Sequence, residues 1–164
     1  MSSRAQRRLA WLRNVLLACT LLAASETTLA QVTITEVTTH DLGTLLGGAS
    51  GRNFILNTDE TVSGTDSGDY LFGAVTGQLD ILGVNKQVNI VADNFSTTGG
   101  VSINAVPCKF HTDAQTTCDG SGINVRINRT QTRILYIGID LDTSQVHSGG
   151  DSPTATYDIN VTIL

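Results

Sequence analysis

The sequence predicts an all-β fold, an antiparallel β-sandwich, preceded by an N-terminal signal peptide. Three observations lead to this prediction. Apolar and polar residues alternate with a period of two in several segments, clusters of Gly, Ser, Thr and Asp separate these segments, and no stretch carries apolar residues at helical spacing over three turns. Short strands without crossover helices favour a sandwich or a barrel of antiparallel strands.

The last third of the chain carries the clearest alternation. Apolar residues fall on one face and polar residues on the other, which is typical of strands with one core face and one wet face. The predicted inward residues are Leu135, Ile137, Ile139 and Leu141 in one strand, Tyr157, Ile159, Val161 and Ile163 in another, and Ile123, Val125 and Ile127 in a third.

Five earlier strands show weaker alternation. Clusters such as Thr97–Gly100 and Asp119–Gly122 separate strands because Gly and Asp favour tight turns. We expect these strands at Val32–Thr38, Arg52–Asn57, Gln78–Leu82, Gln87–Ala92 and Val101–Val106.

Residues 1–30 have the three parts of a secretory signal. Four arginines precede an apolar run from Val15 to Ala24, and Thr28-Leu29-Ala30 supplies small residues for cleavage. The run is about half the roughly 20 residues that a spanning helix needs, so we expect no transmembrane segment after cleavage. A lipoprotein signal cut before Cys19 is the alternative. Residues 31–164 then form a single exported domain, located in the periplasm, at the cell surface or outside a bacterial cell.

The charge argues against one class of partner, and the cysteine content predicts a disulfide. Removing residues 1–30 leaves 6 Lys+Arg against 14 Asp+Glu, a net charge of −8, which repels phosphate backbones and predicts no nucleic-acid partner. Cys108 and Cys118 remain, and an even count in an exported protein predicts a disulfide. Their spacing is not that of a CxxC redox pair.

Catalytic and metal motifs are absent from the sequence. His40, His111 and His147 form no HxH or HExxH pattern, and no GxSxG elbow occurs. Acidic residues cluster in two regions, Asp59, Glu60, Asp66 and Asp69 in one and Asp140, Asp142 and Asp151 in the other, but neither has the order of an EF-hand loop. We therefore expect no cofactor, no resident metal and no enzymatic activity.

Taken together, several segments resemble a known family. They are Asp41–Gly48, Asn53–Asn57, Tyr70–Gly77, Val88–Val91, Leu135–Leu141 and Ala155–Ile163. In this order they resemble a family of exported bacterial β-sandwich proteins known only as a domain of unknown function, similar to spore coat protein U and to chaperone–usher pilins. The resemblance implies an immunoglobulin- or pilin-like sandwich and a surface or fimbria-like role, with self-association or a periplasmic chaperone and usher as partners. The insertion with Cys108 and Cys118 is not part of that pattern.

Pilin-like assembly would need a strand to exchange. The candidate arm is the first strand, with Val32, Ile34 and Val37, in which Glu36 interrupts the apolar stripe. It either completes its own sandwich or leaves to complete a neighbour's, and its length of a single strand favours self-completion.

We therefore expect a non-enzymatic, exported structural or adhesive surface protein. The alternative is a secreted module that binds a glycan or a peptide through loops, with Lys109, Phe110 and His111 as the candidate binding loop. The small number of aromatic residues counts against a glycan site.

Overall fold

The computed structural model describes residues 31–46, 51–64, 70–83, 85–144 and 152–164, and this part of the chain contains strands and no helix. No helix in it could therefore cross a membrane. The predicted signal peptide and Cys19 lie outside the described residues. The strands are β1 Thr33–Thr38, β2 Thr44–Leu46, β3 Asn53–Leu56, β4 Val62–Gly64, β5 Tyr70–Phe72, β6 Gly77–Leu82, β7 Gln87–Thr98, β8 Val101–Ala105, β9 Pro107–Phe110, β10 Thr116–Thr117, β11 Ile123–Arg126, β12 Arg133–Ile137, β13 Ile139–Thr143 and β14 Thr154–Ile163.

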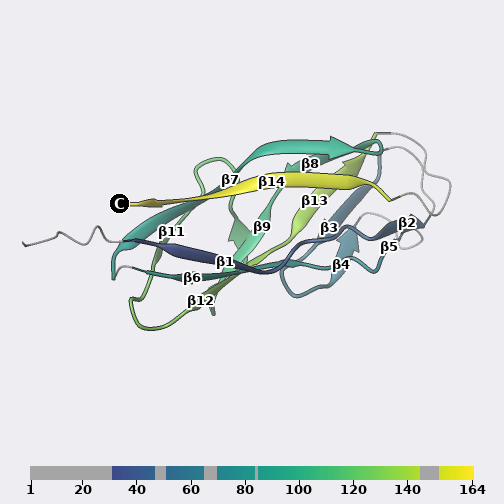
Figure 1. The fold of residues 1–164 in the computed structure, drawn as a ribbon. Coiled ribbons are helices and arrows are strands. Elements are labelled where there is room, and N and C mark those ends of the chain that lie inside the picture. Colours follow the sequence, from purple (N-terminus) through teal and green to yellow (C-terminus); the bar gives the residue numbers. More distant parts are fainter. Residues whose placement is uncertain (1–30, 47–50, 65–69, 84, 145–151) are drawn as a thin grey trace, which may run out of the picture. The chain divides into compact units, whose positions relative to one another are not determined.

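All strand pairs are antiparallel, as predicted, and the strands build a β-sandwich (Figure 1). One sheet has the order β1-β6-β12-β9-β10, and a second has the order β11-β7-β14. A third sheet, β4-β3-β13-β8, and the short pair β2-β5 continue the domain. In Figure 1 the β7–β14 layer lies on one side and the β1–β6–β12 layer on the other.

The core consists of two clusters of aliphatic residues. The larger one lies between the β6–β12–β9 strands and the β7–β11 strands, and includes Ile81, Ile90, Val106, Ile127 and Leu135, each with no exposed surface. The smaller one lies under β3, β8 and β13. Tyr157 and Ile103 pack against both clusters, so the two cores are continuous.

The predicted strand from Arg133 to Leu141 has the expected buried face, but in the structure it forms two strands, β12 and β13. Leu135, Ile137, Ile139 and Leu141 are all buried. At Gly138, the chain passes from the first sheet into the third, and a Cβ atom there would lie 2.0 Å from the Leu56 carbonyl oxygen. Only glycine permits this close approach of two backbones.

Strand β7 is longer than the sequence predicts because a bulge preserves its pairing beyond Ala92. Thr156 pairs with Ser96 and Asp158 with Asp93, so β7 has one extra residue at this point. Asn94 takes the left-handed conformation there, with φ of 52°, and its Nδ2 donates to Asp158 at 2.8 Å. Such bulges tolerate residues that alternation alone places outside a strand.

Candidate functional site

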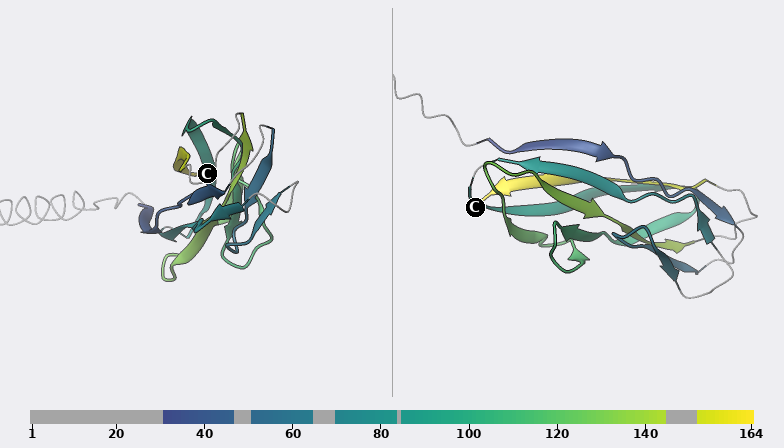
Figure 2. Two further views of the ribbon diagram at one scale, coloured as in Figure 1. Left: turned by 90° about the vertical axis from the view of Figure 1, so that its right-hand side faces the viewer. Right: turned by 90° about the horizontal axis from the view of Figure 1, so that it is seen from below.

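The first strand forms one edge of the sandwich and contributes little to the core. β1 pairs only with β6 of the same chain, and five of its six residues are exposed. Ile34 lies opposite the buried Ile81 and shares its face, yet Ile34 is 41% exposed. Figure 2 shows β1, in blue, as the outermost strand of the domain. β1 is therefore held mainly by backbone hydrogen bonds to β6.

The three residues of the candidate arm differ in their packing. Val32 is half-buried against the larger core cluster. Ile34 faces the core side but is not covered, and Val37 sits where the β1–β6 register shifts and is 52% exposed. In this structure the arm completes its own sandwich.

Strand β14 presents a second edge without a strand partner among the described residues. It pairs only with β7. The Leu164 N–H donates a hydrogen bond to the Gln87 carbonyl of β7. The Ala155 carbonyl instead accepts a hydrogen bond from His40, which lies on the other side of β14. Because alternate residues of a strand direct their backbone groups to opposite edges, the odd-numbered residues from Tyr157 onward present theirs toward β1.

A groove of about 450 Å³ lies between these two edges. Its floor is apolar, with Leu79 from β6 and Ile137 from β12, and the carboxylates that the described residues contribute to its lining are Glu36 and Asp158. The described residues that line it are Ile34, Glu36, Thr38, Thr39, His40, Gly77, Leu79, Ile137, Thr156, Tyr157, Asp158 and Ile159. An apolar floor flanked by strand edges is suited to an extended peptide segment.

His40 fastens the chain to β14 at one end of this groove. Its Nε2–H donates to the Ala155 carbonyl at 2.7 Å, and its ring stacks on Tyr157 with centroids 4.7 Å apart and an angle of 18°. Burial, and secondarily the negative charge of Glu36, raises the pKa of the Tyr157 phenol well above its usual value, so the phenol stays neutral. His40 thus fixes the point where the β1 segment ends.

The predicted disulfide is present. Cys108 on β9 and Cys118, just after β10, are bonded, and both are fully buried. The Cys118 carbonyl accepts the Ala92 N–H of β7 at 2.7 Å, so the disulfide lies where the chain crosses from one sheet to the other.

The candidate binding loop is not a single surface. Phe110 is 5% exposed and belongs to the core. Lys109 points to the other face of the sheet and is the cross-strand partner of Tyr136. Hydrogen bonds from Thr61 lower the pKa of Asp59, and the positive charge of Lys109 lowers it further. His111 follows with a φ of 55°, and its N–H bonds the Ile134 carbonyl.

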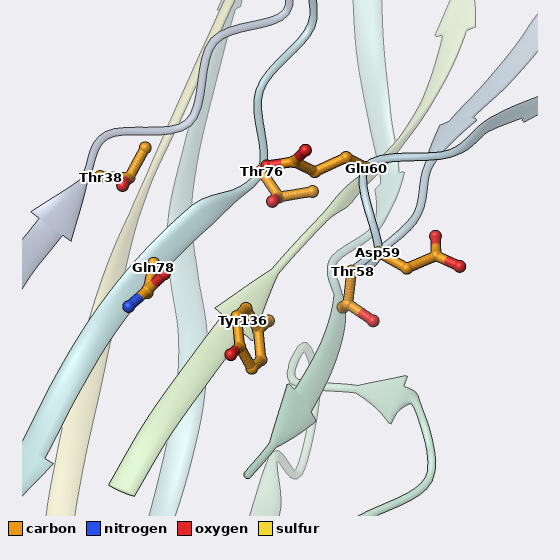
Figure 3. Close-up of a pocket in the computed structure, with 7 residues that line it drawn as sticks. All are labelled: Thr38, Thr58, Asp59, Glu60, Thr76, Gln78 and Tyr136. Carbon is orange, nitrogen blue, oxygen red and sulfur yellow. The ribbon is translucent and has the colours of Figure 1, made fainter. Parts of the chain in front are cut away.

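A second, polar pocket of about 190 Å³ lies beside Lys109 on the outer face of the first sheet (Figure 3). It is lined by Thr38, Thr58, Asp59, Glu60, Thr76, Gln78 and Tyr136. The sequence did not indicate this pocket, because its residues come from four separate segments. The clue that the sequence holds is Asp59-Glu60, which belongs to an acidic cluster.

The remaining histidine and acidic residues either accept hydrogen bonds within the fold or lie outside the described residues. Asp140 and Asp142 both accept hydrogen bonds from the Asn53 side chain, at 2.6 and 3.0 Å. His147, Asp66, Asp69 and Asp151 lie outside the described residues. Within the described residues, no group of three or more His, Cys, Asp or Glu side chains could hold a metal ion.

Comparisons of the chain with family models, with curated proteins and with solved structures find no match.

Proposed function

We propose that this chain is a non-enzymatic, exported surface subunit that assembles by exchanging its first strand. After cleavage behind Ala30, the arm Gln31–Thr39 of one copy pairs with β6 of the next copy in place of the resident β1. The observation that supports this most directly is that β1 is an edge strand with five exposed residues, tied to its own domain by backbone pairing and a single half-buried valine.

The end of the arm at His40 is suited to exchange. His40 is held by both its bond to Ala155 and its stacking on Tyr157, so the chain after Thr39 keeps its place while the arm moves. Exchange of an identical element needs no new interface chemistry, because the incoming arm makes the contacts that the resident arm made. A copy that has not yet received an arm exposes the β6 edge, and a periplasmic chaperone and usher would protect it.

The groove beside β1 supports the same function. It leaves the free edge of β14 next to the arm, so neighbouring copies can add further backbone pairing along this side. The surface location and any adhesive role are part of this proposal.

A cysteine pair tests the exchange. Thr35 and Asp80 are directly opposite in the β1–β6 register, and such pairs have Cα atoms about 4.5–5.5 Å apart, within disulfide range. The Asp80 Oδ1 atom has no hydrogen-bond partner among the described residues, so replacing it breaks no bond of that atom. In Thr35→Cys/Asp80→Cys, exchange links different chains, whereas self-completion links a chain to itself.

The expected result is a set of multi-chain bands on a non-reducing denaturing gel of periplasmic protein, which collapses on reduction. The matched control is Asn89→Cys/Asn124→Cys, a neighbouring pair on β7 and β11 that stays within the chain in either case. If the Thr35/Asp80 pair closes only within single chains, as the control does, strand exchange is wrong.

A further inference from the structure

A second surface of the molecule has the composition of a ligand site, independent of the strand exchange proposed above. The polar pocket lies on the outer face of the first sheet, where Thr38, Gln78 and Tyr136 form one row across β1, β6 and β12. The turn between β3 and β4 extends over this row with Thr58, Asp59 and Glu60, as Figure 3 shows.

The turn is held in place from outside the pocket. The Gln115 side-chain oxygen accepts hydrogen bonds from the Thr58 N–H at 3.1 Å and the Thr58 hydroxyl at 2.7 Å, and its amide donates to Asn57 at 3.3 Å. Gln115 belongs to the loop that the Cys108–Cys118 disulfide closes. The wall of the pocket is therefore fixed before any ligand arrives, which lowers the entropic cost of binding.

The two carboxylates of the turn differ in availability. Asp59 accepts hydrogen bonds from both the N–H and the hydroxyl of Thr61, and in Figure 3 its carboxylate points away from Tyr136. The Glu60 side chain instead extends from the turn toward Thr76. No described residue forms a hydrogen bond or ion pair with the Glu60 carboxylate, so it is available to an incoming donor.

Glu60 also holds its position against its backbone preference. Its φ is 67°, in the left-handed region that glycine and asparagine favour, and the bond from the Glu60 N–H to the Asn57 carbonyl belongs to this tight turn. A side chain that places a free carboxylate over a pocket from such a conformation is consistent with a binding role.

We propose that this pocket binds a single neutral sugar ring, the terminal monosaccharide of a glycan. Sugar hydroxyls can donate to the Glu60 carboxylate and exchange hydrogen bonds with the Gln78 amide and the threonine hydroxyls. The Tyr136 ring offers an apolar surface for the C–H side of the sugar. The pocket has a volume of about 190 Å³. Pockets for drug-sized ligands start at about 300 Å³, so this pocket suits a ligand of one ring.

Other ligand classes fit less well. Anions fit less well because the two carboxylates at the rim, Asp59 and Glu60, outnumber the nearby cation Lys109, the cross-strand partner of Tyr136. A calcium ion takes six to eight oxygen ligands, and the Asp59 carboxylate already accepts two hydrogen bonds from Thr61.

The test is an NMR titration of ¹⁵N-labelled protein purified after export to a bacterial periplasm. Glucose, galactose, mannose and N-acetylglucosamine are each added up to about 50 mM, since a single sugar in a small pocket is expected to bind with a millimolar Kd. The result expected is a saturable shift of the amides around Glu60, Thr76, Gln78 and Tyr136 with at least one sugar.

Four variants locate the site. Glu60→Gln should weaken binding about tenfold, the loss of one charge-assisted hydrogen bond. Tyr136→Ala should abolish the shift, whereas Tyr136→Phe, which keeps the ring, should retain most of the affinity. Asp93→Asn, on β7 in the other sheet, is the matched charge control and should leave the affinity unchanged.

Three results would overturn the proposal. They are the absence of saturable shifts with all four sugars, shifts that Glu60→Gln leaves unaltered, and binding that disappears when calcium is chelated. Each of these is independent of the gel result for strand exchange, so the two proposals can fail separately.

Discussion

Removal of the Cys108–Cys118 disulfide should cost about 3–4 kcal/mol of unfolding free energy. The two residues are 10 apart in sequence, and the chain-entropy relation gives about 2.7 kcal/mol for a loop of this length at 25 °C. Both side chains are fully buried, so replacing each sulfur by hydrogen in Cys108→Ala/Cys118→Ala adds roughly 1 kcal/mol for the small voids. The position of the disulfide, where the chain crosses to β7, supports the upper part of this range.

Urea unfolding followed by circular dichroism measures this loss as a lower midpoint, with a slope that is equal or slightly steeper because the unfolded chain is less constrained. The control is Thr112→Ala, an exposed position within the same loop, which should change stability by less than about 0.5 kcal/mol. A loss below about 1 kcal/mol in the double variant would refute the reasoning, because it would mean that the loop is already ordered by its hydrogen bonds without the covalent link.

Three further predictions follow from single positions. Gly138→Ala should destabilise the domain by about 3 kcal/mol or more, because its Cβ would lie 2.0 Å from the Leu56 carbonyl oxygen; thermal unfolding would detect this, and an unchanged midpoint would show that the strands separate easily. Glu60→Gly should raise stability by about 0.5–1 kcal/mol by relieving the left-handed conformation, whereas Glu60→Ala, which keeps the strain, should not; equal effects would contradict the argument. Because burial raises the pKa of Tyr157, the stability due to its neutral phenol is complete below the ordinary tyrosine pKa of about 10 and is lost as pH rises above it. Urea unfolding between pH 8 and 11 should therefore show a decline that Tyr157→Phe reduces, and an identical decline in both proteins would exclude Tyr157 as its cause.

The sequence was sufficient for the fold class because alternation reports directly on burial. Leu135, Ile137, Ile139 and Leu141 were expected on one face and all are buried, since each strand has one face in the core. The division at Gly138 was not predicted, because a change of sheet leaves the alternation intact. The strands β2, β4, β5 and β10 were also missed, since two or three residues are too few to show a period. The four-residue strand β9 was missed because Pro107 and Cys108 are both buried, which breaks the alternation.

The candidate sites were less accessible to sequence reasoning because they combine distant segments. The bond between His40 and Ala155 joins residues 115 apart in the chain, and no local pattern indicates such a pairing. The candidate binding loop illustrates a different limit. Lys109 and Phe110 are adjacent in sequence but lie on opposite faces of β9, so only Lys109 is near the polar pocket while Phe110 fills the core.

Thr38 links the two proposals, because it lines both the groove and the polar pocket. If the arm is exchanged, the Thr38 of each pocket comes from the neighbouring chain, whereas Glu60 stays with the body. Two defective chains, Thr38→Ala and Glu60→Gln, should then complement each other when they are produced together. With random exchange, about one quarter of the pockets would combine an intact Thr38 with an intact Glu60.

This complementation is measurable as sugar binding by the co-produced protein compared with a mixture of the two proteins made separately and combined after folding. Recovery of about one quarter of the sites in the first sample and none in the second is expected, since completed sandwiches should exchange slowly. If neither sample recovers binding while each variant alone is folded and weakened, the arm stays with its own body. The pocket would then be built by one chain, and the exposed β1 strand would only close its own sandwich.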